Sequence, residues 1–280
     1  GTDSVYVGYN AGGVGVITGT HNVVVGKGAF LEATSGNASV FVGIDAGGQT
    51  TAGGRSAPIT GASNTCVGYG TGYDLTSGHS NVLLGRDAGA NFTDNQRNVA
   101  IGMSAMLDSN GGENYNVAVG FGALESEVTS ANYCVAVGYA ALNLQNANVK
   151  NTAIGGLAGD AITSGASNTL VGYQAGSGMT DSSNNAVFGH NAMSGGNGGN
   201  NTCLGYGAGG GALAGNDNVI VGMQAGDALT DGPGNVLIGR SAGGAMTTSD
   251  YNIAIGFQAL DALTTNSHNN IAIGANALTT

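Results

Sequence analysis

The chain has 280 residues, of which 54 are glycine and only two are proline, and its formal net charge at pH 7 is −11. The glycines have no three-residue period, which excludes a collagen-like triple helix, and a charged fraction of 8% does not fit a charged, disordered chain. Six basic residues against 17 acidic ones predict no nucleic-acid partner and no docking on anionic membranes, since both are bound through lysine and arginine. No stretch is apolar over the ~20 residues that a membrane-spanning helix needs, so we expect no direct membrane insertion of this segment.

One short phrase, Asn-x-apolar-apolar-Gly-x-x-Ala, recurs sixteen times from one end of the chain to the other. Successive glycines of the phrase are 16 to 18 residues apart, with one step of 25. Such a period predicts an all-β, repetitive parallel β-solenoid of about sixteen coils, with residues 1–280 forming a single repeat domain. The chain begins and ends inside the pattern, and we expect it to be a fragment of a longer fibre. The glycines of the phrase, called motif glycines below, are Gly8, Gly26, Gly43, Gly68, Gly85, Gly102, Gly120, Gly138, Gly155, Gly172, Gly189, Gly205, Gly222, Gly239, Gly256 and Gly274.

The residues before each motif glycine predict a short strand, in which successive side chains point to opposite faces. The residue directly before the glycine is Val, Ile, Leu or Phe in all sixteen repeats, and the residue three before it is Val, Ile, Thr or Ala. We assign these two positions to the interior of the coil. The residue two before the glycine is uncharged throughout, which predicts that the outward face is covered by other copies of the chain in a parallel homotrimer. The residues expected at this trimer interface are Leu83, Ala100, Ala118, Ala136, Ala153, Leu170, Ile220, Leu237, Ala254 and Ala272.

The other positions of the phrase predict structural roles. Asn stands four residues before the glycine in thirteen repeats, which predicts a ladder of stacked side-chain amides at a left-handed corner. Ala stands three after the glycine in fifteen repeats, which indicates close backbone approach, and the glycine itself is expected where no Cβ fits. An apolar residue further on, such as Leu75, Ile162, Met179 or Leu229, is expected to close the coil from a second, shorter strand.

Three of the repeats, Asn98–Ala105, Asn116–Ala123 and Asn270–Ala277, resemble the head repeats of YadA-type trimeric autotransporter adhesins. Similar phrases occur in bacteriophage tail-fibre proteins, and the resemblance covers essentially the whole chain. It implies a left-handed parallel β-roll in which three chains wind round a common axis. The coils here, at about seventeen residues, are longer than those of the adhesin head, so each is expected to carry a longer outer turn.

The residue directly after the motif glycine is the variable, chemically rich position of the repeat. A tyrosine there can stack on a sugar ring and donate a hydrogen bond, which predicts a carbohydrate-binding stripe. The alternative, which the pattern favours, is an aromatic ladder that packs one coil on the next. The candidate ligand-binding residues at this position are Tyr69, Tyr139, Tyr173, Tyr206, Arg86 and Arg240.

The one long step, between Gly43 and Gly68, predicts an inserted loop over residues 49–62. Its residues include Arg55, a further candidate for ligand binding, and Pro58. Loops on a rigid scaffold often carry binding residues, although a long insertion is also tolerated without any function.

No pattern in the sequence predicts catalysis, a metal or a cofactor. The four histidines lie in different registers of the repeat, and no Ser/His/Asp arrangement or metal-ligand spacing stands out. A glycan-cleaving tailspike would need two opposed carboxylates in a cleft, of which the sequence gives no sign. The cysteines Cys66, Cys134 and Cys203 are expected to be small buried apolar residues.

These observations predict a structural and adhesive trimeric fibre rather than an enzyme. Its expected partners are other copies of itself and a cell-surface glycan or protein receptor, and its expected location is extracellular, on a bacterial cell or a virion. A phage tail or capsid fibre that binds a receptor or serves only as a spacer is the alternative. An ice-binding solenoid or a glycan-cleaving tailspike agrees less well with the pattern.

Overall fold

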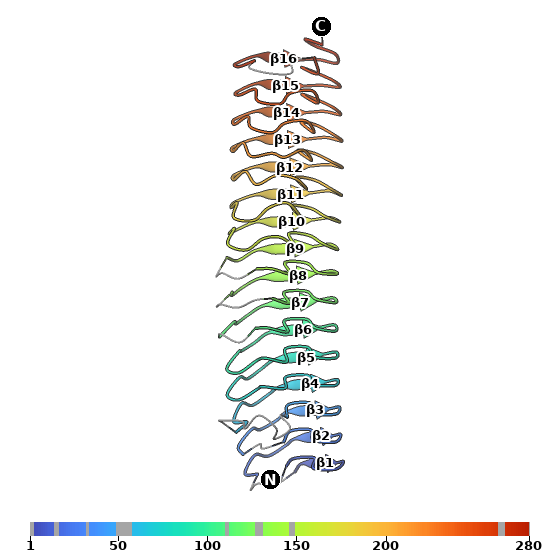
Figure 1. Cartoon of the computed structure of the whole chain (residues 1–280), viewed down its shortest axis with the longest axis vertical. Coiled ribbons are helices and arrows are strands. Elements are labelled where there is room, and N and C mark those ends of the chain that lie inside the picture. The colour runs from blue at the N-terminus through green and yellow to red at the C-terminus, as the bar shows by residue number, and fades with distance from the viewer. Residues whose placement is uncertain are drawn as a thin grey trace. The chain divides into compact units, whose positions relative to one another are not determined.

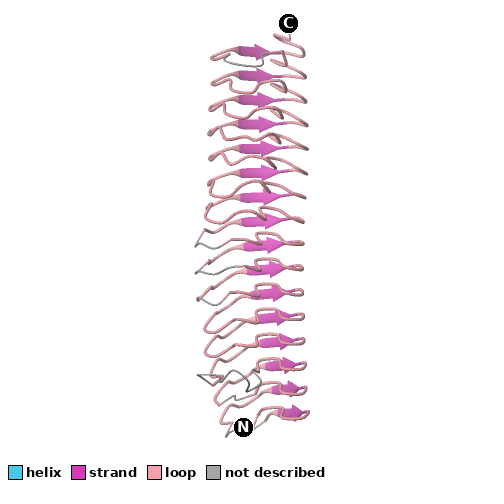
Figure 2. Ribbon diagram, in the orientation of Figure 1, coloured by secondary structure: helices cyan, strands magenta, loops and turns pink. Residues whose placement is uncertain are grey.

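A computed structural model describes residues 3–13, 17–31, 34–48, 58–109, 112–126, 131–145, 149–262 and 267–279. The chain is an all-β parallel β-solenoid, as the repeat predicts, and the residues described contain strands and turns but no helix (Figure 2). Over these same ranges there is accordingly no helix of the length and apolarity that crossing a membrane requires. The chain divides into two compact units, Gly1–Asn148 and Val149–Thr280.

Each repeat contributes one strand of three residues, which ends directly before its motif glycine. The strands of the first unit are β1 (Val5–Val7), β2 (Val23–Val25), β3 (Val40–Val42), β4 (Thr65–Val67), β5 (Val82–Leu84), β6 (Val99–Ile101), β7 (Val117–Val119) and β8 (Val135–Val137). Those of the second are β9 (Thr152–Ile154), β10 (Thr169–Val171), β11 (Ala186–Phe188), β12 (Thr202–Leu204), β13 (Val219–Val221), β14 (Val236–Ile238), β15 (Ile253–Ile255) and β16 (Ile271–Ile273). Within each unit every strand pairs in parallel with the next one in the same register of the repeat (Figure 1).

The coil turns at three residues with left-handed backbone: the fifth before the motif glycine, and the second and fourth after it. In the repeat of Gly172 these are Ser167, Gln174 and Gly176, with φ of 59°, 54° and 64°. The motif glycines have φ between 127° and 146° in all sixteen repeats, a region that side chains rarely allow. A Cβ on Gly172 would also lie closer than 3.0 Å to the backbone oxygen of Gly189 in the next coil. The prediction that no Cβ fits at this glycine is confirmed.

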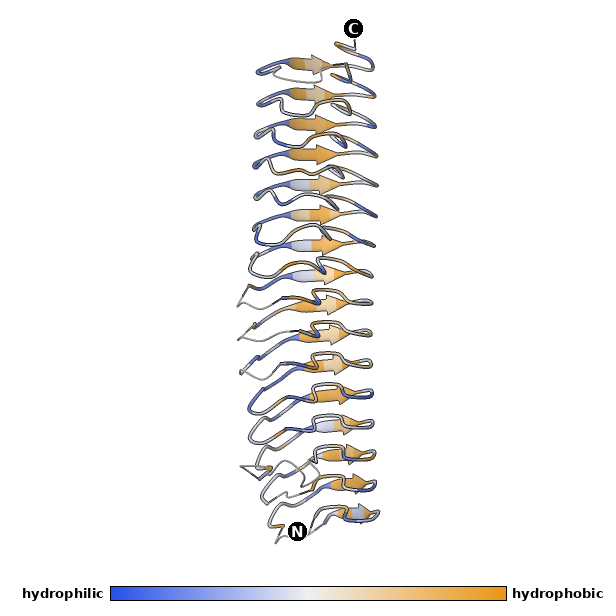
Figure 3. Cartoon of the chain, viewed as in Figure 1, coloured by the Kyte–Doolittle hydropathy of each residue, from blue (hydrophilic) through white to orange (hydrophobic). Residues whose placement is uncertain are grey.

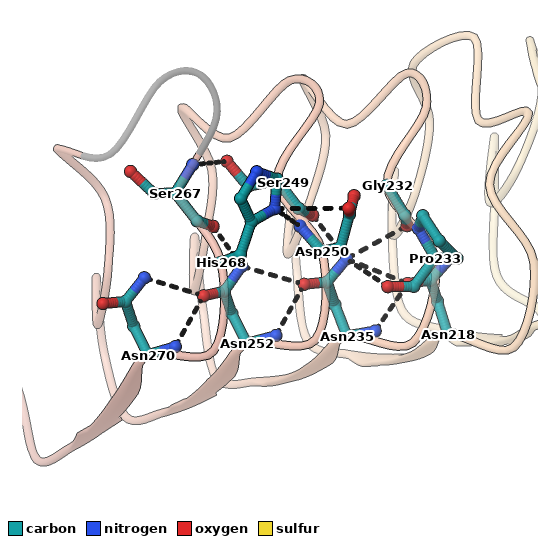
Figure 4. Close-up of polar contacts among 10 residues, drawn as sticks. All are labelled: Asn218, Gly232, Pro233, Asn235, Ser249, Asp250, Asn252, Ser267, His268 and Asn270. Carbon is teal, nitrogen blue, oxygen red and sulfur yellow. Dashed lines mark hydrogen bonds and ion pairs between the residues drawn. The ribbon is translucent and has the colours of Figure 1, made fainter.

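The predicted asparagine ladder is present (Figure 4). In many coils the side-chain amide nitrogen of the asparagine donates to the side-chain oxygen of the asparagine in the preceding coil, over 3.1 Å from Asn235 to Asn218 and 3.2 Å from Asn252 to Asn235. The second hydrogen of the Asn235 amide reaches the backbone oxygen of Ser249, 2.8 Å away in the same coil. The ladder thus satisfies buried amides within a coil and between coils. The left-handed corner expected at the asparagine lies instead at the residue before it.

The two faces of the strands are the reverse of the prediction. The middle residue of the strand is buried in fifteen of the sixteen strands, whereas the first and third are exposed or half-exposed in every one. In β5, Leu83 is fully buried and its neighbour Leu84 is 38% exposed. Figure 3 shows that most strands are apolar along their length and that the strongly hydrophilic residues gather in the turns, so the strand residues alone did not distinguish the two faces.

The ten residues predicted to form a trimer interface therefore lie inside their own coil. Each is between 0 and 2% exposed in the single chain, and no surface remains on it for a partner to cover. The residues corrected in this way are Leu83, Ala100, Ala118, Ala136, Ala153, Leu170, Ile220, Leu237, Ala254 and Ala272. The surface-facing apolar residues are those at the first and third positions of each strand, which the prediction had placed inside.

Two alternative residue pairs fill the interior beside the strand. In most coils whose fourth residue after the motif glycine is itself glycine, a large apolar residue follows three or four positions later, as Met179 follows Gly176. In most coils whose fourth residue is large, the residue three positions later is small or polar, as Ser109 follows Met106. A Cβ on Gly176 would lie 2.7 Å from the sulfur of Met179, so the two positions compete for one space.

The residues predicted to close the coil are buried, but the second strand predicted around them is absent. Leu75, Ile162, Met179 and Leu229 are each fully buried. Over the described ranges, the sixteen strands are supplemented by isolated bridges, from Gln96 to Asn114, from Asn114 to Asn132 and at Ile59. Left-handed corners, which interrupt regular pairing, keep these residues in turns.

Candidate functional site

The side chains that follow the motif glycines are exposed and stack from coil to coil. In the first unit the guanidinium of Arg86 lies over the ring of Tyr69, 5.6 Å from its centre. The rings of Phe121 and Tyr139 stack with centres 5.7 Å apart. Tyr69 is 52% exposed and Tyr139 58% exposed, so each ring keeps a free portion beside its stacking partner.

The same position forms two further stacks in the second unit. The ring of His190 lies between Tyr173 and Tyr206, with centres 5.3 Å away on both sides. Arg240 lies over the ring of Phe257, 5.6 Å from its centre. The structure therefore shows the coil-on-coil packing of the aromatic ladder and leaves sugar binding by the stripe a prediction. Of the inserted loop predicted over 49–62, residues 49–57, including Arg55, lie outside the described residues, and Ile59 is fully buried.

One pocket opens beside the stripe in the first unit, with a volume of about 280 Å³. It lies in the turns that follow β3, β4, β5 and β6, at the corner where the chain leaves each strand. Aromatic rings, carboxylates and small or aliphatic residues share its lining. The lining residues are Asp45, Tyr69, Gly70, Tyr73, Asp87, Ala90 and Leu107.

The two carboxylates of the pocket stand at the same place in their coils, the second residue after the motif glycine. Asp45 and Asp87 have φ of 54° and 55°, a left-handed conformation that aspartate tolerates better than most residues. The oxygen Oδ2 of Asp87 accepts a hydrogen bond from Nε of Arg86 over 3.0 Å. Arg86 therefore connects the ring of Tyr69 to the carboxylate of Asp87, and it fixes the orientation of both.

The pocket carries a net negative charge. It has two aspartates, and of the residues described here only Arg86 forms an ion pair with either of them. Oδ1 of Asp45 is buried and has no hydrogen-bond partner. This oxygen lies beside Gly28 of the preceding coil, outside the pocket lining, so a ligand would meet the other oxygen of the partly exposed Asp45 carboxylate. An ionised carboxylate is an acceptor at both oxygens.

Sequence reasoning missed part of the pocket and a second aromatic row. Tyr73, Asp45 and Asp87 were not predicted as site residues, and aspartate stands at the second position after the glycine in only two of the sixteen repeats. On the other side of the strands, the rings of Tyr115 and Tyr133 stack with centres 5.0 Å apart. This second row occupies the position before the ladder asparagine, where the left-handed corner turns side chains outward.

The cysteines are free and buried, as predicted. Burial raises the pKa of the Cys203 thiol to about 12, and it raises the pKa of Cys66 as well. Burial also raises the pKa of Asp160, and that of Asp227 is raised by burial and by the charge of Asp261. Across the ranges that the structure covers, no three His, Cys, Asp or Glu side chains gather to hold a metal ion.

Comparison with known proteins does not place this chain in a family. No protein-family model matches the sequence, and no curated protein matches it. The likeness to YadA-type head repeats thus stays a resemblance carried by the repeated phrase.

Proposed function

We propose that this chain is a segment of a homotrimeric surface fibre that acts in attachment, and that it is not an enzyme. The observation that carries the proposal is the apolar outward face of the strands. The resemblance to adhesin head repeats and tail-fibre repeats supports an extracellular location, on a bacterial cell or a virion. A left-handed β-roll with three parallel chains is the assembly that this resemblance implies.

The outward face is uncharged in every coil of each unit, and the third strand residue on it is always apolar. Its residues are Val, Ile, Leu, Phe, Thr or Ala in all sixteen strands, and none is charged. Parallel pairing in register places these residues side by side within a unit, for example Val82 beside Val99 and Leu84 beside Ile101. Soluble monomers rarely expose a contiguous apolar patch above a few hundred Å². Covering this patch stabilises an assembly by about 25 cal/mol for each Å² of apolar surface removed from water.

Another copy of the same chain is the proposed covering, because its outward face has the same repeat and the same chemistry. Closed rotational symmetry is the usual arrangement when identical surfaces associate. Three parallel copies would bring the same strand of each chain to one level of the fibre axis. The turns, with the stacked rings and the pocket, would stay at the outside of such an assembly.

The test is the absolute mass of the purified chain by light scattering across a dilution series. We expect a mass near three times 27.2 kDa that holds on dilution. A stable monomer at all concentrations would refute the proposed assembly.

Adjacent leucines provide a matched pair of variants. Leu84→Asp places a charge on the outward face and is expected to shift the mass toward the monomer while the β-sheet circular dichroism remains. Leu83→Asp places the same charge in the core of the coil and is expected to unfold the chain locally or prevent its folding. A stable trimer in Leu84→Asp would show that the outward strand face is not the interface. Leu204→Asp in β12 repeats the test in the second unit.

A further inference from the structure

We propose that the pocket between Asp45, Tyr69, Tyr73 and Asp87 binds a single uncharged sugar unit of a glycan. The inference rests on the attachment function proposed above and deepens it by naming the site and the ligand class. It differs from a general tyrosine stripe because it uses residues from three positions of the coil and not one. The pocket lies wholly in the first unit.

The aromatic walls suit the apolar face of a sugar ring. Tyr69 and Tyr73 both line the pocket, and Tyr69 is about half exposed. Arg86 stacks on Tyr69, which restricts the ring and reduces the entropy lost when a ligand binds. A tyrosine offers an apolar ring and a hydroxyl together, which matches a sugar with carbon–hydrogen faces and hydroxyl edges.

The carboxylates suit the hydroxyl edge of the same ligand. Asp45 and Asp87 come from coils on either side of Gly70, whose lack of a side chain leaves room between them. Sugar hydroxyls are donors, and hydrogen bonds to an ionised carboxylate are stronger than those between neutral groups. Arg86 holds one carboxylate in place, while Asp45 is partly exposed and forms no ion pair with any residue in the described ranges.

Size and charge narrow the ligand class. A volume of about 280 Å³ lies just below the ~300–1,000 Å³ of typical small-ligand pockets, which fits one sugar unit and not an extended chain. Two aspartates against one arginine disfavour sialic and uronic acids, because a second carboxylate would be repelled at short range. The same charge favours neutral hexoses and N-acetylated hexosamines.

The experiment uses the full chain on an array of immobilised neutral and sialylated oligosaccharides, followed by titration of the best soluble glycan. Dense immobilisation makes weak single-site binding visible through multivalency. We expect binding to neutral glycans, with sialylated ones at least tenfold weaker. Absence of binding to any neutral glycan, or a preference for acidic ones, would overturn the proposal.

Matched variants assign the binding to the pocket. Tyr69→Ala and Asp45→Asn are each expected to weaken binding at least tenfold. Tyr139→Ala removes a tyrosine from the same position of another coil, outside the pocket, and is expected to change binding less than twofold. Asn10 and Asn191 occupy the position of Asp45 in their coils with the same left-handed backbone, so Asp45→Asn is compatible with the fold. Equal losses in Tyr69→Ala and Tyr139→Ala would refute the pocket and favour the whole stripe.

The proposed pocket and the proposed trimer can each fail without the other. A trimer that binds no neutral glycan would refute the pocket and leave the assembly standing. A monomer whose binding depends on Tyr69 and Asp45 would refute the assembly and leave the pocket standing.

Discussion

Replacement of one ladder asparagine tests how much of the stability of the solenoid comes from buried amides. Asn168 is 1% exposed, and its amide nitrogen donates to Oδ1 of Asn151 over 3.2 Å and to the backbone oxygen of Ser182 over 2.9 Å. Its own Oδ1 accepts the backbone N–H and the side-chain amide of Asn185, over 2.9 and 3.1 Å. Asn168→Ala therefore removes all four hydrogen bonds and leaves two backbone groups, the Ser182 oxygen and the Asn185 N–H, without partners.

Each buried polar group that loses its partner costs about 1–3 kcal/mol, so the two together lower the stability of this part of the chain by about 2–6 kcal/mol. Asn168→Ser is expected to cost about half as much. The chain itself uses serine at this position in another coil, where Oγ of Ser39 accepts the backbone N–H of Asn64 over 3.1 Å. Serine thus restores the acceptor for Asn185 but not the donor to Ser182.

Amide hydrogen exchange is the appropriate assay, because repeat arrays need not unfold in a single two-state step. The opening free energy at Asn185 and its neighbours should fall in the order wild type, serine, alanine. Asn216→Ala provides the control, because Asn216 is exposed and its side-chain oxygen accepts a single hydrogen bond, from the backbone N–H of Gly199. A loss below about 0.5 kcal/mol in Asn168→Ala, or equal losses for serine and alanine, would refute the ladder as a main source of stability.

Three further sets of variants, in other coils, test the packing of the solenoid. Gly155→Ala should lower the melting temperature strongly, since φ is 141° and the added Cβ meets the next backbone, whereas the adjacent Gly156→Ala places its Cβ only in ordinary contact and should be neutral. Burial raises the pKa of the Cys203 thiol from 9.0 to about 12, so above pH 9 the thiol ionises in the unfolded chain before it does in the folded one. The free energy of unfolding should therefore fall by about 1 kcal/mol per pH unit between pH 9 and 12. A Cys203→Ala variant should lack this share of the pH dependence in alkaline unfolding. Gly159→Leu and Ile162→Ser should each destabilise alone but compensate when combined, because the two positions fill one space; additive losses in a double-mutant cycle would contradict this.

The architecture could be predicted from the sequence because a nearly constant period fixes the length of each coil. Parallel strands in register, the glycine turn and the asparagine ladder all follow from one phrase repeated in phase. The buried face of the strand could not be predicted, because the residues of both faces are uncharged and periodicity alone does not show which face lies inside the coil. A useful signal was present in residues further along the coil. In most coils with a large residue at the fourth position after the glycine, a small or polar residue stands three positions later, as in Met106 and Ser109, which indicates that the two positions share one packed interior.

That packing shows how a ligand site can arise in so uniform a fold. The middle strand residue, the ladder asparagine and the alanine after the turn are buried in almost every coil and allow little variation. The outward strand residues are uncharged throughout, so they offer little chemistry that differs between coils. All seven residues that line the pocket come from three remaining positions, the first, second and fifth after the motif glycine. Because these positions lie in turns outside the core, three or four successive coils can acquire, lose or change a binding site while the solenoid that holds it stays the same.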